Sequence, residues 1–261
     1  MVRVYVASHV DVPAPELSYC TPIQTGAFAK TPWRGYLSDN QGQNISAKNR
    51  YFGELTGLYW VWKNTTDERV GWCHYRRYLS PVLFAQTHRK GVGVDLRLAQ
   101  DILNQDKAGE LFDFELRLSQ IIVPTMIPVD VSSQDWYCAT HRREDWACML
   151  EALHAVHPDE ALAAQQFMAS VHPLHFWCIF MARREVLDAY CQWLFPLLFH
   201  LETMITPSED NFLCRVYAFL SEHLFNWWTH SRGLQMVERP IIFLSESKPA
   251  GVDQFGTSLA A

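Results

Sequence analysis

Short apolar runs that alternate with amphipathic helical segments are the feature of this sequence that most constrains its fold. Residues 2–7 are rich in β-branched side chains and are predicted to form a buried strand, and residues 120–123 and 175–182 have the same character. Residues 51–63 and 95–105 carry apolar side chains at helical spacing. Because strands and helices alternate, the sequence predicts an α/β fold.

The carboxyl-terminal half of the chain contributes most of the predicted helices. Residues 130–169 look mostly helical, and Pro158 stands where a helix can start. Two longer helices are predicted over residues 185–203 and 209–230, because apolar side chains recur every three or four positions in each. These helices supply enough apolar surface to cover a face of the predicted sheet.

The composition indicates one packed domain. The 261 residues are 49% hydrophobic and 19% charged, which excludes a disordered or low-complexity protein. No internal repeat or linker is visible, so we predict a single domain over residues 1–245 and a flexible tail over residues 246–261, which are mostly small and polar. The net charge of −6 gives no chain-wide basic field, so nucleic acid is not expected among the partners.

The protein is expected in the cytoplasm. Its seven scattered cysteines have no CxxC spacing and suggest reduced thiols rather than a disulfide framework. The apolar run at the amino terminus is too short for a secretory signal. The apolar stretch 186–201 is interrupted by polar residues and falls short of the roughly 20 residues that cross a membrane. The alternative is peripheral contact with the inner face of the membrane, made by the tryptophan-rich helix predicted over residues 211–230.

The tetrapeptide His74-Tyr75-Arg76-Arg77 is the most informative motif. It lies near the end of a predicted strand over residues 69–79, and open α/β sheets bind ligands at the carboxyl ends of their strands. A guanidinium group can donate two parallel hydrogen bonds to the oxygens of a phosphate. A phosphate or diphosphate is therefore the expected ligand. Alternation along an unbroken strand would place Arg76 and Arg77 on opposite faces. The alternative interpretation is a surface pair of arginines bonded to nearby carboxylates.

A polar segment over residues 39–49 precedes the helix predicted at 51–63. Its mixture of carboxamide, hydroxyl, carboxylate and ammonium groups suits sugar hydroxyls and phosphate oxygens, although the same residue types also dominate ordinary turns. Glu54, one turn into the helix, is a candidate to orient the basic residues. Ser46 or Asn49 is expected to cap the helix. The candidate donor-binding residues of the segment are Asp39, Asn44, Ser46, Lys48 and Asn49.

Two carboxylates, Glu209 and Asp210, stand where the helix over 209–230 is predicted to begin. Ser208 can cap that helix, and acidic groups there meet the positive end of the helix dipole, so a purely structural role explains them well. The functional alternative is a general base that takes the proton of an attacking hydroxyl.

Other chemistries find little support in the sequence. The pairs His154/His157 and His172/His175 have helix-compatible spacing for a metal, but neither pair has an obvious third ligand, so no metal site is predicted. The sequence contains no G-x-S-x-G elbow, no P-loop and no G-x-G-x-x-G. Serine hydrolases, P-loop nucleotide hydrolases and Rossmann dehydrogenases are therefore disfavoured.

Five segments carry a resemblance to a known family. They are PIQTGAFA (22–29), DNQGQNISAKNRYFGELTGLYWVWKN (39–64), VGWCHYRRYL (70–79), FWCIFMARREVLDAYCQWLFPLLFHLE (176–202) and RVYAFLSEHLFNWW (215–228). In this order they resemble a bacterial glycosyltransferase family of capsule, exopolysaccharide and O-antigen gene clusters, formerly a domain of unknown function. The resemblance implies a GT-A-like fold with a central mixed sheet flanked by helices. It also implies a galactofuranosyltransferase that acts on UDP-galactofuranose and a lipid-linked glycan.

The resemblance also bears on metal dependence. Many GT-A enzymes end a central strand in D-x-D, whose carboxylates hold a divalent metal against the donor diphosphate, whereas the comparable strand here ends in His74-Tyr75-Arg76. We therefore expect cationic side chains to replace the metal, so that no cofactor is required, with manganese or magnesium as the alternative. Stabilisation of the leaving diphosphate would then fall to Arg76, Arg77 and Lys48.

A catalytic base is implied in the same way. Glu209-Asp210 followed by Arg215 resembles the E-D pair that precedes an arginine in many inverting GT-A enzymes, in which the aspartate is the base. A β-furanoside made from an α-linked donor requires inversion. Asp210, with Glu209 beside it, is therefore the expected catalytic base.

Two positions depart from the pattern of that family. His9, counted here with the donor site, is followed by Val10 where the family commonly has lysine, and His223 stands where an S-E-R-L motif has arginine. These departures bear on recognition of the donor or of a lipid-linked or oligosaccharide acceptor. The alternatives are a transferase that uses another nucleotide sugar, such as UDP-galactopyranose, and a non-catalytic glycan- or nucleotide-binding subunit of a polysaccharide-synthesis complex.

Overall fold

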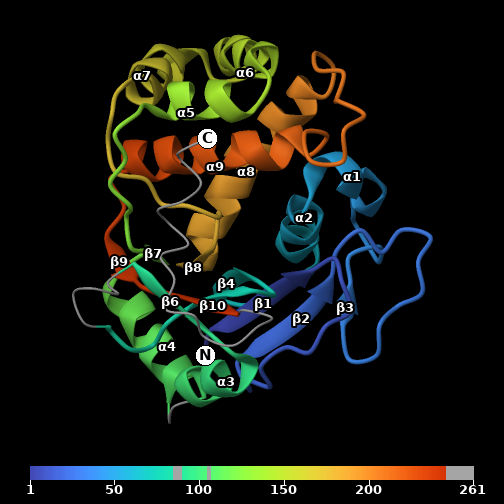
Figure 1. Cartoon of the computed structure of the whole chain (residues 1–261), viewed down its shortest axis with the longest axis vertical. Helices are drawn as coiled ribbons and strands as arrows, with labels where there is room; N and C mark the ends of the chain where they lie inside the picture. Colours follow the sequence, from blue (N-terminus) through green and yellow to red (C-terminus); the bar gives the residue numbers. More distant parts are fainter. Residues whose placement is uncertain (85–89, 105–106, 245–261) are drawn as a thin grey trace.

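A mixed β-sheet forms the centre of the molecule (Figure 1). The computed structural model describes residues 1–84, 90–104 and 107–244, and the ten strands of this part pair into one sheet with the main order β3-β2-β1-β4-β5-β10-β6. The predicted tail over 246–261 lies outside the described residues. The strands are β1 (Arg3–Ser8), β2 (Cys20–Gln24), β3 (Leu37–Ser38), β4 (Arg69–His74), β5 (Arg77–Leu79), β6 (Gly91–Val94), β7 (Ile121–Pro124), β8 (Phe180–Arg183), β9 (Met236–Arg239) and β10 (Ile241–Leu244).

Helices cover both faces of this sheet (Figure 1). Helices α3 and α4 pack on one face, α2, α8 and α9 pack on the other, and α5, α6 and α7 form a further layer over α8 and α9. Their bounds are α1 (Asn49–Phe52), α2 (Leu55–Asn64), α3 (Leu96–Leu103), α4 (Ala108–Leu118), α5 (Ser133–Thr140), α6 (Arg143–Val156), α7 (Pro158–Ala169), α8 (Arg184–Leu201) and α9 (Val216–Ser231). The predicted α/β architecture is confirmed.

Two hydrophobic cores follow from the two-residue period of the strands. In β1, Tyr5 and Ala7 belong to the core under α2, α8 and α9, whereas Val4 and Val6 belong to the core against α3 and α4. Strands β1, β2 and β4 run parallel, so their carboxyl ends share one edge of the sheet. The residues that follow these strands are thereby gathered at that edge.

Several predicted elements have different boundaries in the structure. The strand expected over 69–79 is two strands, because β4 ends at His74, a turn follows, and β5 returns antiparallel. The alternation that placed Arg76 and Arg77 on opposite faces therefore does not apply. The strand expected over 175–182 begins only at β8, because Trp177 and Cys178 have φ angles of 72° and 45°.

The segment before α2 also differs from the prediction. A short 3-10 turn and α1 precede α2, and Gly53, with a φ of 54°, separates the two helices. Neither Ser46 nor Asn49 is the N-cap of α1 or α2, whose N-caps are Lys48 and Glu54, and both side chains bond elsewhere. Strand β2 was not predicted, because the prolines around it suggested a loop; Pro22 lies within it, opposite Val6.

Helix predictions in the carboxyl-terminal half agree better with the structure. The segment 130–169 contains α5, α6 and α7, and Pro158 is the first residue of α7. The helix expected over 185–203 is α8, with Pro196 inside it. The helix expected over 209–230 begins only at α9, so the residues before Val216 form turns.

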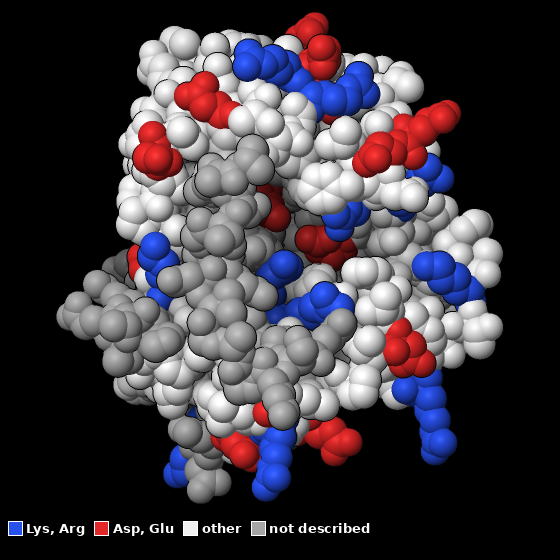
Figure 2. All heavy atoms as spheres, viewed as in Figure 1, with Lys and Arg blue, Asp and Glu red and all other residues white. Residues whose placement is uncertain are grey.

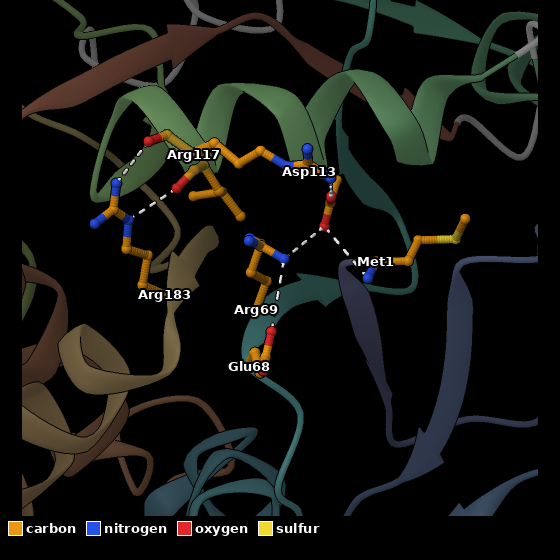
Figure 3. A network of polar contacts seen from close by, with 7 residues as sticks. Met1, Glu68, Arg69, Asp113, Arg117 and Arg183 are labelled. Atoms are coloured by element: carbon orange, nitrogen blue, oxygen red, sulfur yellow. Dashed lines mark hydrogen bonds and ion pairs between the residues drawn. The ribbon is translucent and has the colours of Figure 1, made fainter.

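A polar network fastens α4 to the sheet (Figure 3). The buried carboxylate of Asp113 lies 3.2 Å from Arg69 on β4, 3.0 Å from Arg117 and 3.4 Å from the amino group of Met1. Arg183, which ends β8, donates to two main-chain carbonyls at the end of α4. One carboxylate thus joins three cationic groups from separate parts of the fold.

Two further observations concern sulfur and membranes. All seven cysteines lie within the described residues and carry free thiols, and four of them are buried. Across residues 1–84, 90–104 and 107–244, every helix is too short or too polar to cross a membrane.

Candidate functional site

The ends of β1 and β4 bring the predicted histidines and arginines together. In the parallel register Ala7 lies opposite His74, so His9 follows β1 at the edge where β4 ends. The ring centroids of His9 and His74 are 6.3 Å apart, and Tyr75 meets His9 edge-on at 5.4 Å. The Arg76 guanidinium lies 5.1 Å from the centroid of the Tyr75 ring. This edge is where open α/β sheets bind their ligands.

Arg77 lies within electrostatic range of two carboxylates, one in α9 and one just before α2. Its guanidinium lies 5.8 Å from the centroid of the Trp177 ring. Burial lowers the pKa of Arg77, and the negative charges of Glu222 in α9 and Glu54 just before α2 raise it. Figure 2 shows a hollow near the middle of the viewed face with basic and acidic side chains inside it. The hollow therefore contains charges of both signs. The attraction between such charges is stronger where water is excluded.

Arg215 is a third cation of this cluster. Its guanidinium lies 5.2 Å and 5.1 Å from the ring centroids of Phe212 and Phe219. Burial and other charged groups have the largest effects on the pKa values of His74 and Glu222. The positive charge of Arg215 lowers both pKa values further, so Arg215 lies close to both side chains. Within the part of the chain that the structure describes, its buried Nε has no hydrogen-bond partner. A buried donor of this kind is suited to an anionic or polar ligand.

The histidines of the cluster are neutral at pH 7. Burial, followed by the charge of Arg77, lowers the pKa of His74 to about 3. Burial also lowers the pKa of His9, although the charge of Glu54 raises it. The positive charge at this edge is therefore carried by the arginines, which keep it at every physiological pH.

Glu222 has the most unusual carboxyl group of the cluster. Burial, followed by the charge of Glu54, raises the pKa of Glu222 to about 7, whereas Arg77, the main-chain N–H of Trp177 and Arg215 lower it. That N–H donates to Oε2 of Glu222 at 3.4 Å. A carboxyl group that titrates near neutrality can accept a proton and release it again, as general acid–base catalysis requires.

Asp39 and Ser46 serve the loop itself. Asp39 is completely buried, and its carboxylate accepts hydrogen bonds from the main-chain N–H groups of Gly26 and Ala27 at 2.8 and 2.9 Å. It also accepts from the hydroxyls of Ser46 and Thr56. The structure places these two predicted donor-binding residues inside the protein, where they hold the loop against α2.

The other predicted polar residues of the loop also have protein partners. The Asn44 amide donates to two main-chain carbonyls of its own loop. The Asn49 amide donates to the carbonyl of Gly53 at 2.7 Å and to the hydroxyl of Thr56 at 3.0 Å. Lys48 forms an ion pair with Glu202. The structure thus joins the loop to its neighbours through the side chains that were expected to bind the donor.

Glu209 and Asp210 lie on an exposed turn before α9. One oxygen of Asp210 accepts the main-chain N–H groups of Phe212 and Leu213 at 2.8 and 2.9 Å, and these hydrogen bonds lower the pKa of Asp210. The main-chain carbonyl of Glu209 accepts a hydrogen bond from Arg50. Both carboxyl groups remain open to solvent.

Two histidines of the pairs with metal-like spacing pack against aromatic rings. His157 stacks on Trp193 and contacts its carbonyl oxygen at 2.9 Å, and His172 packs on Phe167. Among residues 1–84, 90–104 and 107–244, no three His, Cys, Asp or Glu side chains are grouped so as to hold a metal ion.

Three members of the charged cluster were not predicted as donor-binding residues from the sequence: Glu222, Arg215 and Trp177. Glu222 follows Arg215, the residue just before α9, by seven positions, which is close to two helical turns. This spacing was visible in the segment RVYAFLSEHL, of which Arg215 was considered only with Glu209 and Asp210, and His223 only as a departure from the family pattern. Trp177 lies in an apolar run that was predicted to be part of a strand.

Comparison with known proteins identifies the family. Residues 3–233 match the family described as Domain of unknown function (DUF4422). The chain belongs to the DUF4422 family. The apo structure of the WbbM bifunctional glycosyltransferase is similar to this DUF4422 chain, with a TM-score of 0.80 and 23% sequence identity. The similarity covers 97% of this chain and 48% of the other, so the DUF4422 chain spans about half the length of that protein.

The comparison with WbbM confirms the expected GT-A-like fold at the level of architecture. A search of curated proteins gave no match. The family of the chain and its fold are thereby established.

Proposed function

We propose that this DUF4422 chain is a glycosyltransferase that binds a nucleotide diphosphate sugar at the carboxyl edge of β1 and β4. The observation that carries the proposal is the cluster of Arg76, Arg77 and Arg215 at the edge where open α/β sheets bind ligands. Guanidinium groups pair with diphosphate oxygens and stabilise the charge that develops when the diphosphate leaves. The fold shared with WbbM supports the same reaction class.

The proposed donor is UDP-galactofuranose, and the proposed acceptor is a lipid-linked glycan or an oligosaccharide in cell-surface polysaccharide synthesis. Support comes from the sequence motifs, above all the segments 39–64 and 70–79. UDP-galactopyranose is the alternative donor, because galactofuranose and galactopyranose present the same classes of hydroxyl groups. The reaction would take place on the cytoplasmic side of the membrane, where the protein makes peripheral contact.

The proposed reaction is a single displacement. The acceptor hydroxyl oxygen forms a bond to the anomeric carbon of the donor sugar. The bond between that carbon and the diphosphate oxygen breaks, and its electron pair leaves with the diphosphate. The hydroxyl proton passes to a carboxylate base, and attack from the opposite side inverts the anomeric centre.

Two carboxylates are candidates for the base. Asp210, with Glu209 beside it, is proposed on the resemblance to inverting GT-A enzymes. Glu222 is the second candidate, supported by its proximity to Arg77 and by a pKa of about 7, which makes it the stronger base. The hydrogen bonds that lower the pKa of Asp210 make its carboxylate a weaker base.

The proposal includes transfer without a metal ion, since arginines would carry the charge of the leaving diphosphate. The test is transfer from UDP-galactofuranose to a synthetic lipid-linked galactoside, with and without EDTA. Equal rates support the proposal. Loss of transfer in EDTA, restored by manganese or magnesium, would overturn metal independence.

A second candidate function is a non-catalytic nucleotide- or glycan-binding subunit. It is favoured by the exposed position of Asp210, which leaves that carboxylate outside the charged cluster. The same assay decides between the two functions. Binding of UDP with no transfer and no hydrolysis of the donor would favour the binding subunit.

A further inference from the structure

A small cavity of about 110 Å³ opens beside the charged cluster, between α5, α9 and the segment before β8. We call it the aromatic pocket. Three aromatic side chains and three polar ones give it its chemical character: Trp136, Phe176, Phe219, His141, His175 and Glu222. Glu222 belongs both to this pocket and to the cluster around Arg77. Whatever fills the pocket therefore lies next to the proposed site of the diphosphate.

The side chain of His175 carries a hydrogen-bond acceptor that has no donor. The residue is only 2% exposed, and its Nδ1 atom lies 2.7 Å from the carbonyl oxygen of Pro124. Because a carbonyl only accepts, Nδ1 carries the hydrogen, and Nε2 keeps its lone pair while the ring is neutral. Burial lowers the pKa of His175, so the neutral ring prevails at pH 7. Over the residues that the structure describes, Nε2 has no hydrogen-bond partner.

Asn226 holds the main chain of His175 in place. Its side-chain oxygen accepts the main-chain N–H of His175 at 2.8 Å, and its amide nitrogen donates to the carbonyl of His175 at 2.8 Å. The ring is thus fixed at both its main chain and its Nδ1 atom. This orientation of His175 exists without a ligand, which lowers the entropy cost of binding one.

His141 repeats this arrangement on another wall. Its Nδ1 lies 2.8 Å from the hydroxyl oxygen of Thr140, whose own proton goes to the carbonyl of Trp136 at 3.1 Å. The Thr140 oxygen therefore accepts from Nδ1, and Nε2 of His141 again keeps the lone pair. Burial lowers the pKa of His141, and its buried Nε2 is likewise unpartnered within the described chain.

His141, His175 and Glu222 all line this cavity, and the two unpartnered acceptors and the carboxyl group that they carry favour a ligand that donates hydrogen bonds. A metal ion does not fit, because the described His, Cys, Asp and Glu side chains form no group of three that could hold one. An anion is disfavoured by the lone pairs of the two neutral histidines and by the Glu222 carboxyl group. A neutral molecule with hydroxyl groups and an apolar face satisfies both the acceptors and the aromatic walls. A sugar ring has these properties.

We propose that the aromatic pocket binds one sugar ring of the substrates, whose hydroxyls donate to Nε2 of His141 and of His175 while its C–H face packs on the aromatic walls. This inference rests on the proposed function and names a subsite within it. The ring belongs either to the acceptor or to the donor sugar, since Glu222 places the pocket beside the diphosphate in both cases.

The test uses the variants His175→Asn and His141→Asn. An asparagine amide can still donate toward Pro124 or Thr140 but lacks the Nε2 acceptor. His154→Asn, at an exposed position on α6, is the matched control. Binding of UDP, of UDP-galactose and of methyl β-D-galactofuranoside is measured by calorimetry and ligand-observed NMR. Melting temperatures establish that each variant is folded, and His141→Asn carries the test if His175→Asn is not.

If the pocket holds the donor sugar, the pocket variants bind UDP-galactose about 3- to 10-fold more weakly and bind UDP as before. If it holds the acceptor ring, UDP and UDP-galactose bind as before and the methyl galactofuranoside binds about 3- to 10-fold more weakly. Unchanged binding of both sugars would overturn the proposal, because the pocket would then hold only water. Failure of the unmodified protein to bind UDP would instead contradict the proposed function, and the glycoside measurement tests the pocket independently.

Discussion

Glu222 is the residue at which burial and chemistry are most directly linked. Its pKa of about 7 reflects burial first and the charge of Glu54 second, opposed by Arg77, the Trp177 N–H and Arg215. A base works in its deprotonated form. If Glu222 is the base, kcat/KM for transfer therefore rises as the pH increases through about 7 and is constant above it. A pH series from 5.5 to 9 measures this, and Glu222→Gln is expected to lose roughly 10²-fold or more together with the pH dependence.

Asp210→Asn is the matched comparison for that experiment. The two main-chain hydrogen bonds to Asp210 lower its pKa, so a reaction that used this base would show no rise near pH 7. A flat profile above pH 5.5, with the larger loss in Asp210→Asn, would assign the base to Asp210. Glu222 would then serve only to position Arg77.

The raised pKa of Glu222 also predicts a cost in stability. The folded protein binds this proton more tightly than the unfolded chain does, so the contribution of Glu222 to stability is greatest below about pH 4.5 and decreases as the pH rises through about 7. Glu222→Gln does not titrate and is expected to melt several degrees above the unmodified protein at pH 8, with the difference shrinking at pH 5. Thermal melts at both pH values measure it. Glu151→Gln, at an exposed position, should show no such difference.

The residues of the site could be predicted in part. The run from His74 to Arg77 was identified because two adjacent arginines at the end of a strand have a recognisable chemistry. Glu222 was not, because a single glutamate in a helix resembles any surface residue until packing encloses it. The polar segment over residues 39–49 is predicted to bind the donor. In the structure, Asp39 and Asn49 form hydrogen bonds with other parts of the protein. Residue type alone does not distinguish those two uses.

At the scale of elements, the loop before α1 depends on one carboxylate. Asp39 accepts four hydrogen bonds that join the end of β2, the loop and α2. Asp39→Asn removes the charge and presents an N–H group to existing donors, so we expect a loss of about 3 kcal/mol in the free energy of unfolding. Urea denaturation measures this. Asp130→Asn, at an exposed position, is the control, and an equal effect of both substitutions would contradict the role given to Asp39.

Element boundaries were predictable where periodicity determines them and not elsewhere. Helix α8 matches its prediction because its apolar side chains recur regularly over eighteen residues. The division between β4 and β5 and the late start of β8 depend on turns that contain no glycine or proline, at residues 75–76 and at Trp177 and Cys178. These turns lie beside the charged cluster, where tertiary contacts override local preference.

At the scale of the whole molecule, the site concentrates positive charge in an acidic protein. The chain has a net charge of −6, yet Arg76, Arg77 and Arg215 gather beside one edge of the sheet. Two hydrophobic cores hold that edge, one on each face. The similarity to WbbM, at 23% identity and a TM-score of 0.80, indicates that this architecture tolerates extensive sequence change. The local charge pattern is therefore a better guide to the ligand than overall composition is.

Arg76, Arg77 and Arg215 are proposed to bind the diphosphate of a nucleotide sugar without a metal. The most direct measurement is the melting temperature of the protein titrated with UDP in EDTA. A ligand at about 100 times its Kd stabilises the folded state by about 2.7 kcal/mol, which corresponds to a rise of several degrees. We predict this rise for the unmodified protein and for Arg3→Ala, which removes an arginine at the opposite end of β1. We predict its loss in the double variant Arg76→Ala/Arg77→Ala. No rise, a rise only with manganese, or an equal rise in the double variant would contradict the claim.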